Sequence, residues 1–298
     1  MTFYTFMGSV EQGLVYAIMV LGVYLTFRVL DFPDLTVDGT LPLGAAVTGS
    51  LMLMGWDPFT SLAVAMLAGA AAGCLTALLS TKLRIMSLLA SIITMTALYS
   101  INIRIMGRPN LALLNQTTIF DVLSLQTVPR YLSVPLVFLV VVAAWKLLLD
   151  FFLHTRLGLS LRGTGDNPQM IRSQGVNTDT MIIIGVSLSN ALVALSGGLV
   201  AQSQGFADVG MGIGTIVAGL ASVILGESLV GKQSVMRQTL SAVAGSLVYR
   251  LAIAVALSYN VGFFRLTPSD LNLITALLVV FCLTVPMVRG RFIRKKNA

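Results

Sequence analysis

The sequence has few charged residues and almost no histidine or cysteine. Of its 298 residues only 10% are charged and 56% are apolar, whereas a typical soluble domain carries roughly 25% charged residues. The mean hydropathy of +0.89 excludes a water-soluble fold, because the chain has too few polar side chains to cover its surface. The composition indicates a single transmembrane domain, residues 1–298, surrounded by membrane lipids.

The scarcity of reactive side chains also argues against several kinds of site. Cys74 and Cys282 lie far apart in apolar runs, and His154 is the sole histidine, so we expect neither a disulfide nor a metal site. The formal net charge of +7 does not indicate nucleic-acid binding here, since Lys and Arg in short loops orient membrane helices. The motifs of intramembrane enzymes, such as H-E-x-x-H or a Cys/His cluster, are missing from the sequence.

Apolar runs long enough to cross a bilayer recur along the chain. A span needs about 20 apolar residues. Candidate spans, about nine in all, lie at residues 12–30, 41–55, 59–80, 85–106, 132–153, 180–203, 210–228, 237–259 and 271–288. Two are weak, since 41–55 is short and flanked by Pro33 and Pro42, and 210–228 is rich in glycine. We therefore expect an all-α polytopic membrane helical bundle with two broken or re-entrant helices.

Basic residues cluster in every second loop: Lys82, Arg84, Arg156, Arg162, Arg172, Lys232, Arg237 and the tail 289–296. The positive-inside rule places such loops in the cytoplasm. This pattern predicts an N-terminus outside the membrane and a cytoplasmic C-terminus.

Two short segments resemble each other. Residues 32–39 read FPDLTVDG and residues 206–213 read FADVGMGI, and each follows a strong span and precedes a weak one. By the charge pattern they begin on opposite faces of the membrane. An inverted repeat, with halves 12–153 and 180–288, would bring its two broken helices together near the midplane. A chance similarity between two loops is the alternative.

Charged and polar residues at membrane depth are candidate pathway residues, since a charge at a helix centre costs roughly 2.5–3.5 kcal/mol on insertion scales. Arg250 lies well inside span 237–259, where it could bind a substrate carboxylate or an acidic residue of the bundle. The predicted translocation pathway comprises Asp34, Thr36, Asp38, Asn190, Asp208 and Arg250, with the three Asp residues as possible partners of Arg250. Structural pairing that locks the bundle explains these residues equally well.

Other residues inside the spans indicate helix packing. Tyr99 and Asn102 are more typical of interhelical hydrogen bonds than of ligand contacts. Gly69 and Gly73 form a G-x-x-x-G pattern, which predicts a close helix crossing. The outer loop 107–131 has two readings, as an interfacial amphipathic helix or as a docking ledge on which Arg108 and Arg130 contact a soluble partner.

The most informative segment is a hydrophilic island at 154–179 between two apolar runs. Asp166 or Asn167 can cap a short helix, Pro168 suits its first turn, and Gly175 is a natural stop. The glycines before it are expected to loosen the backbone. A short, rigid helix parallel to the membrane is suited to contact a partner, and an ordinary connecting loop is the alternative.

Residues 226–234, GESLVGKQS, almost match the phosphate-binding pattern G-x-x-x-x-G-K-[ST]. Gln233 stands in place of the hydroxyl residue, and a membrane span rather than a strand precedes the segment. We therefore expect a loop with a basic side chain, and no ATP bound to this chain.

The island and the segment 32–46 resemble the corresponding parts of ABC-importer permeases for branched-chain amino acids and ribose-type sugars. The shared pattern is a Gly-rich turn, Asn-Pro, a short helix and Gly-Val-Asn, here ending at Asn177, followed by a span with Ser196-Gly197-Gly198. Residues 32–39 look closest to a branch associated with aromatic amino acid uptake. Asp38 and Pro42 replace the small residues usual in sugar permeases, which disfavours a sugar.

This resemblance implies a homodimeric importer permease in a bacterial cytoplasmic membrane. A separate cytoplasmic ATPase would hold ATP and Mg²⁺, and an extracytoplasmic solute-binding protein would contact Arg108 and Arg130. The residues implied in ATPase coupling are Arg162, Gly163, Gly165, Asn167, Pro168, Arg172 and Gly175. The alternative is a stand-alone secondary transporter of a small anion or amino acid, which would require acidic or histidine relays deep inside the spans.

Overall fold

The computed structural model describes residues 3–258, except 115, 124–129 and 232–233, together with positions 277, 280 and 284. Its elements are α1 (Phe3–Tyr24), the π-helical turn η1 (Leu25–Val29), α2 (Val37–Leu53), α3 (Pro58–Thr81), α4 (Ser87–Met106), β1 (Asn110–Ala112), α5 (Ile119–Leu123), α6 (Arg130–His154), α7 (Arg156–Asp166), α8 (Pro168–Ser173), α9 (Thr178–Gln204), β2 (Phe206–Asp208), the 3₁₀ turn η2 (Val209–Gly212), α10 (Thr215–Val230) and α11 (Val235–Ser258). Within these residues, 7 helical segments are long and apolar enough to cross a membrane, and α2 is a shorter apolar helix. The predicted all-α polytopic bundle is confirmed, while the candidate span 271–288 falls almost wholly outside the described residues.

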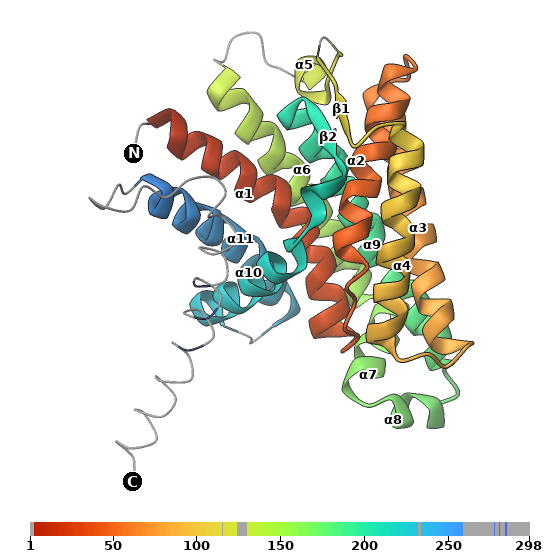
Figure 1. Ribbon diagram of the computed structural model, residues 1–298. Coiled ribbons are helices and arrows are strands. Elements are labelled where there is room, and N and C mark those ends of the chain that lie inside the picture. Colours follow the sequence, from red (N-terminus) through yellow and green to blue (C-terminus); the bar gives the residue numbers. More distant parts are fainter. Residues whose placement is uncertain are drawn as a thin grey trace, which may run out of the picture.

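Helices α1, α2 and α9 form the centre of the bundle. Most of their side chains are buried, including the continuous runs 13–25 in α1 and η1 and 189–202 in α9. Figure 1 shows α3 and α4 on one side of this centre and α10 and α11 on the other, with α7 and α8 at one end. The short strands β1 and β2 lie at the opposite end.

Small residues allow the central helices to cross at close range. A Cβ placed on Gly44 would lie 1.9 Å from the Ala194 carbonyl oxygen, and one on Gly197 would lie 1.9 Å from that of Leu41. A Cβ on Gly69 or Gly73 of α3 would lie 2.5 Å from a backbone carbonyl oxygen of α9. The predicted close helix crossing at the G-x-x-x-G pattern is therefore confirmed.

Replacement of Gly197 with alanine is expected to destabilise the bundle, because the added Cβ would force α2 and α9 apart. Overpacking of this kind costs about 1–3 kcal/mol. The midpoint of thermal unfolding of the purified chain in detergent measures the effect. Gly8→Ala is the matched control, since nothing lies within 4 Å of a Cβ at Gly8 of α1. Equal midpoints for the two variants would contradict the close crossing.

The two weak spans differ in detail from the prediction. Helix α2 begins at Val37 rather than near position 41 and continues through Pro42. Helix α10 begins at Thr215, after η2 and a turn at Gly214. The irregular backbone therefore precedes each helix instead of interrupting it. Each half-helix, 17 residues in α2 and 16 in α10, follows a non-helical lead.

The two half-helices run in opposite directions. The end of α2 meets the end of α4, where Ser50 Oγ donates to the Ile105 carbonyl at 3.1 Å. The end of α10 lies at the other end of the bundle, where Glu227 contacts Arg28. Their beginnings meet inside the bundle through Asp38. This arrangement is what an inverted repeat would produce, although the repeat halves 12–153 and 180–288 stay a prediction.

One element was not expected from the sequence. Strands β1 and β2 form an antiparallel pair in which Asn110 faces Asp208 and Ala112 faces Phe206. The pair ties the start of the outer loop 107–131 to the lead of α10. A strand of three residues is too short to show an alternating pattern, which is why the sequence did not reveal it.

Candidate functional site

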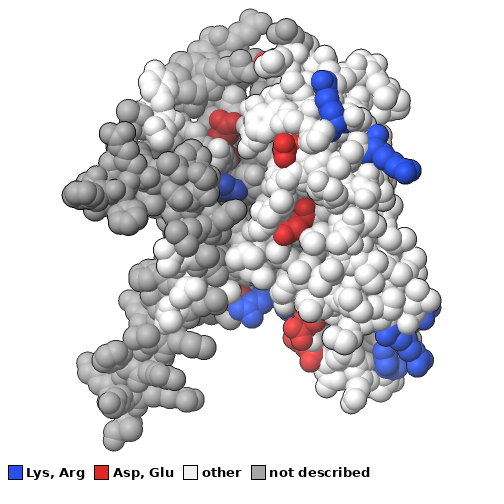
Figure 2. Space-filling view, in the orientation of Figure 1, with Lys and Arg blue, Asp and Glu red and all other residues white. Residues whose placement is uncertain are grey.

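Basic residues mark the end of the molecule that carries α7 and α8. The turn between α3 and α4 holds Lys82 and Arg84, and the helices α7 and α8 hold Arg156, Arg162 and Arg172. In Figure 2 blue side chains gather at this end. The predicted grouping of basic loops on one side therefore agrees with the fold for these five residues, while Lys232 and the tail 289–296 lie outside the described residues.

Helix α8 forms as the sequence predicted. Asn167 Oδ1 accepts a hydrogen bond from Met170 N at 3.1 Å and so caps the helix, while Pro168 occupies its first position. Gly175 ends the segment with a φ of +82°, which favours glycine. The hydrogen bond of Asn167 thus fixes the start of this short helix, and the backbone conformation of Gly175 fixes its end.

The segment before α8 corrects the prediction of a loosened backbone, because it is the helix α7. Thr155 Oγ1 caps α7 by accepting from Gly158 N at 3.2 Å. Its glycines serve close packing instead: a Cβ on Gly158 would lie 2.2 Å from the Phe152 carbonyl oxygen, and one on Gly165 would lie 2.1 Å from that of Val29. Gly165 thus lets α7 rest directly against η1, the end of the first span.

Helix α8 is anchored on one face and open on the other. Ile171 is buried, and a Cβ on Gly163 of α7 would lie 2.6 Å from its Cδ1 atom. Arg172 Nε donates to Thr178 Oγ1 at 2.7 Å, which fixes α8 to the start of α9. The side chain of Met170 is 49% exposed, and Pro168, Gln169, Ser173 and Gln174 are exposed as well.

A groove of about 870 Å³ runs beside this helix. It lies between the end of α3, the following turn and the α8–α9 connection, and Arg84, Arg172, Asn177 and Asp179 are among its lining residues. Arg172 also lies 3.7 Å from the Asp179 carboxylate. The exposed face of α8 and this groove together form a surface suited to a soluble partner.

Three of the predicted pathway residues form one buried network. Asn190 Nδ2 donates to Asp34 Oδ2 at 2.7 Å, and the backbone N–H of Thr36 donates to Asp34 Oδ1 at 2.9 Å. Two threonines complete the network: Thr40 donates to Asn190 Oδ1 at 2.7 Å, and Thr76 lies 2.9 Å from Thr36. All five side chains are fully buried, so the network joins α2, α3 and α9.

Asp38 links the two half-helices. Its Oδ1 accepts from Ile216 N at 2.8 Å and from Thr215 Oγ1 at 3.0 Å, and its Oδ2 accepts from Gly214 N at 3.0 Å. A carboxylate from the first turn of α2 therefore caps α10, and its charge faces the positive ends of both helix dipoles. Sequence analysis assigned Asp38 to the pathway but did not foresee this contact.

The possible pairing of Arg250 with Asp34, Asp38 or Asp208 is not observed among the described residues. The guanidinium of Arg250 lies over the ring of Tyr16, with its Cζ 3.8 Å from the ring centroid, a cation–π contact between α11 and α1. Asp208 instead accepts from Gly210 N at 2.7 Å and from Asn110 Nδ2 at 3.2 Å. Each of the three aspartates accepts hydrogen bonds from nearby donors, and Arg250 stacks on an aromatic ring.

The two predicted docking residues lie toward the end opposite α8. Arg108 is exposed in the connection between α4 and β1. Arg130 begins α6, and its side chain lies outside the described residues.

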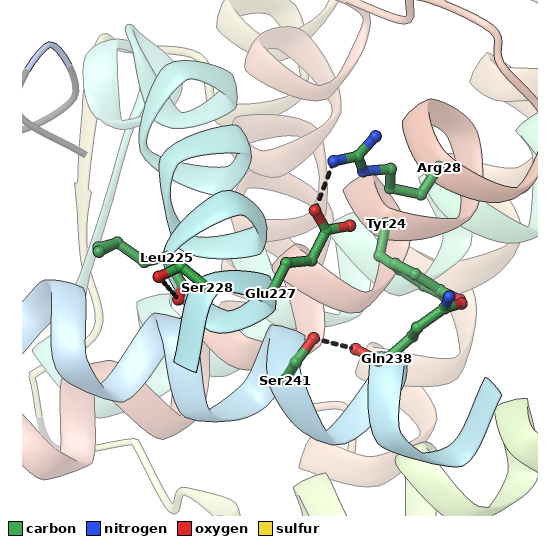
Figure 3. Close-up of polar contacts among 7 residues, drawn as sticks. All are labelled: Tyr24, Arg28, Leu225, Glu227, Ser228, Gln238 and Ser241. Carbon is green, nitrogen blue, oxygen red and sulfur yellow. Dashed lines mark hydrogen bonds and ion pairs between the residues drawn. The ribbon is translucent and has the colours of Figure 1, made fainter. Parts of the chain in front are cut away.

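Sequence analysis missed a polar cluster that joins the first span to the last two described helices. Arg28 of η1 forms an ion pair with Glu227 of α10, and Tyr24 donates to Gln238 Oε1 of α11 at 2.7 Å. Figure 3 shows Arg28 and Glu227 pointing toward one another from these elements. No local pattern marks partners that lie about two hundred residues apart in the chain.

The first part of the segment that nearly matches a phosphate-binding loop belongs to a helix, whereas Lys232 and Gln233, where a loop was predicted, lie outside the described residues. Residues 226–230 form the last turns of α10, and a Cβ on Gly226 would lie 1.8 Å from the Ser241 carbonyl oxygen. Gly226 therefore provides close packing of α10 on α11, and Glu227 binds Arg28.

A multi-pass bundle with two half-helices meeting inside it, and an exposed capped helix at its basic end, defines a membrane transport subunit. The chain belongs to the family of permease components of branched-chain amino acid transport systems, whose model matches residues 6–292. The resemblance seen in the sequence is thereby confirmed. The chain is a permease of an ABC-type transport system for small solutes, a class that works with ATPase and binding-protein partners.

Several proteins share substantial identity with the chain. It is 41% identical over 269 residues to a tyrosine transport system permease protein of Clostridioides difficile, covering 90% of this chain and 87% of that protein. It is 34% identical over 188 residues to an uncharacterised protein of Rickettsia prowazekii, covering 62% and 64% of the two chains. It is 29% identical over 190 residues to the ribose import permease protein of Escherichia coli, covering 62% and 57%. No solved structure matches the chain.

Proposed function

We propose that this chain is the permease subunit of an importer that moves an amino acid into a bacterial cell, driven by a separate cytoplasmic ATPase. The observation that carries the proposal is α8, a capped helix with an exposed face at the basic end of the bundle. Under the positive-inside rule this end is cytoplasmic, which places the N-terminus outside and α8 within reach of an ATPase. Two copies of the chain would each contribute one α8.

The contacts within the chain offer a route from α8 to the two half-helices. Helix α8 rests on α7, and α7 rests on η1 at Gly165. The ion pair between Arg28 and Glu227 ties η1 to the end of α10, and Asp38 ties the start of α10 to α2. We propose that ATP-driven movement of the ATPase displaces α8 and that this chain of rigid contacts shifts α2 and α10, opening the pathway inward.

The proposed solute is an amino acid with an aromatic or large apolar side chain. The similarity to a tyrosine transport permease supports this class, and Asp38 and Pro42 at the start of α2 disfavour a sugar. At the opposite end, Arg108 and the β1–β2 pair offer a surface for an extracytoplasmic solute-binding protein. Arg130 is proposed to contribute to the same surface.

Co-purification tests the proposal. The tagged chain, expressed in a bacterial membrane, is expected to retain a P-loop ATPase in a fixed ratio. Replacement of residues 167–175 with a Gly/Ser linker is expected to abolish retention. A chain that purifies alone in every detergent tried would instead favour a stand-alone secondary transporter.

Asn167 provides a finer variant pair for the same measurement. Asn167→Ala removes the cap of α8 and is expected to weaken ATPase retention, since loss of a cap costs about 0.5–2 kcal/mol of helix stability. Asn167→Asp keeps an oxygen that can accept from Met170 N and is expected to retain the ATPase. Equal retention by both variants would show that the folded state of α8 is irrelevant to binding.

A further inference from the structure

A cavity of about 240 Å³ lies between the start of α2, the second half of α4 and η2. Its apolar lining comes from Pro42, Met95, Val209 and Ile213, and its polar lining includes Asp38, Tyr99 and Asn102. At a rise of about 1.5 Å per residue, Met95 and Asn102 lie about 12 and 22 Å along α4 from Ser87. The cavity is therefore near the middle of a hydrocarbon core about 30 Å thick.

Asn102 contributes an acceptor that the described part of the chain does not satisfy. Its side chain is only 1% exposed, and its Nδ2 donates to the Gly39 carbonyl oxygen at 3.1 Å. Its Oδ1 is buried and receives no hydrogen bond from any described residue. The Gly39 carbonyl determines which end of the amide is nitrogen, because a flipped amide would set two acceptors against each other. Asn102 lines the cavity, so a ligand bound there is one source of the donor that this acceptor lacks.

The polar groups of Asp38 and Tyr99 indicate which functional groups that ligand would carry. Asp38 already accepts from Gly214 N, Thr215 Oγ1 and Ile216 N, but its carboxylate places a negative charge at the cavity wall. This charge, together with the acceptor Asn102 Oδ1, suits an ammonium group. Tyr99 brings a hydroxyl donor, which suits a carboxylate, and an aromatic ring beside the apolar lining. The groups complement an amino acid with an apolar or aromatic side chain.

We propose that this cavity is a solute-binding site within the permease itself, in which Asn102 Oδ1 and Asp38 bind the α-ammonium group of an amino acid. Pro42, Met95, Val209 and Ile213 contact its side chain. The choice of an amino acid rests on the proposed function, while the requirement for a donor at Asn102 rests on the cavity alone. Selection of the solute is then shared between the permease and any binding protein.

Binding to the purified full-length chain in lipid nanodiscs tests the site. The probes are L-tyrosine and its des-amino analogue 3-(4-hydroxyphenyl)propionate, which lacks only the ammonium group. L-Tyrosine is expected to bind saturably and the analogue at least about tenfold more weakly, because a hydrogen bond to a charged group is lost. Asn102→Leu is expected to weaken L-tyrosine binding at least about tenfold and to leave the analogue unaffected.

Thr94→Val is the matched control on the same helix. Thr94 is buried and donates to the Ala90 carbonyl oxygen at 3.1 Å, and it does not line the cavity. This variant is expected to keep the preference for L-tyrosine over the analogue. The comparison of the two probes on the unmodified chain needs no variant, so it remains decisive if Asn102→Leu does not fold.

Two results would overturn the site. One is the absence of saturable binding of L-tyrosine, L-phenylalanine or L-leucine, and the other is an unchanged probe preference in folded Asn102→Leu. Either result together with ATPase retention and ATP-driven uptake would remove the cavity proposal alone. Ammonium-dependent binding by a chain that retains no ATPase would remove the proposed ATP-driven function alone.

Discussion

Replacement of Asn190 with leucine is expected to lower the free energy of unfolding by at least about 1–3 kcal/mol, since the buried polar groups of Asp34 and Thr40 lose their hydrogen-bond partner. Asn190 donates to Asp34 and accepts from Thr40 at 2.7 Å in each case, and all three side chains are fully buried. Leucine fills a similar volume but supplies no polar group. The midpoint of thermal unfolding in detergent, monitored by size-exclusion chromatography, measures the loss of stability.

A double variant separates the hydrogen bond from packing effects. Asp34→Asn combined with Asn190→Asp exchanges the amide and the carboxylate, so that one donor and one acceptor still face each other. Its midpoint of thermal unfolding is expected to lie between those of the unmodified chain and Asn190→Leu. Wild-type stability in Asn190→Leu would contradict a stabilising role for the buried network.

Replacement of Asp38 with alanine is expected to reduce solute uptake at least about tenfold. The variant loses the charge-assisted hydrogen bonds between α2 and α10, which we propose are needed for transport. The variant leaves Gly214 N, Ile216 N and the Thr215 hydroxyl without the carboxylate that joins α10 to α2. The two half-helices would then move independently of each other. Uptake by cells expressing equal amounts of chain in the membrane measures this effect.

Asp57→Ala is the matched control for that experiment. Asp57 also caps a helix, accepting from Phe59 N of α3 at 3.0 Å, but it lies at an exposed end of the bundle. Its removal is expected to leave uptake close to that of the unmodified chain. Equal uptake by the Asp38 and Asp57 variants would show that the link between α2 and α10 has no part in transport.

The sequence predicted features whose causes are local. The cap at Asn167, the proline after it and the glycine stop at Gly175 all act within a few residues, and α8 formed as expected. The spans followed from composition in the same way, because an apolar run of sufficient length needs no tertiary partner to be recognised. The G-x-x-x-G crossing at Gly69 and Gly73 was likewise readable from spacing.

The contacts that define the candidate site depend on partners distant in sequence. Asp38 caps a helix 176 residues further on, and nothing near Asp38 distinguishes a cap from a pathway residue. Arg250 was considered a possible partner of a carboxylate, yet its guanidinium stacks on the ring of Tyr16 in α1. The glycines of α7 were read as flexible, whereas Gly158 and Gly165 are required for close packing. The roles of these residues depend on contacts with residues distant in sequence, and a single sequence does not show those contacts.

We propose that α8 and α7 couple an ATPase to the half-helices, and the ratio of solute imported to ATP hydrolysed tests this coupling most directly. In proteoliposomes that contain the chain and its ATPase, Gly165→Ala separates α7 from η1, because the added Cβ would lie 2.1 Å from the Val29 carbonyl oxygen. We expect that hydrolysis continues while import per ATP falls severalfold, and that Gly8→Ala leaves the ratio unchanged. An unaltered ratio in Gly165→Ala would contradict the claim.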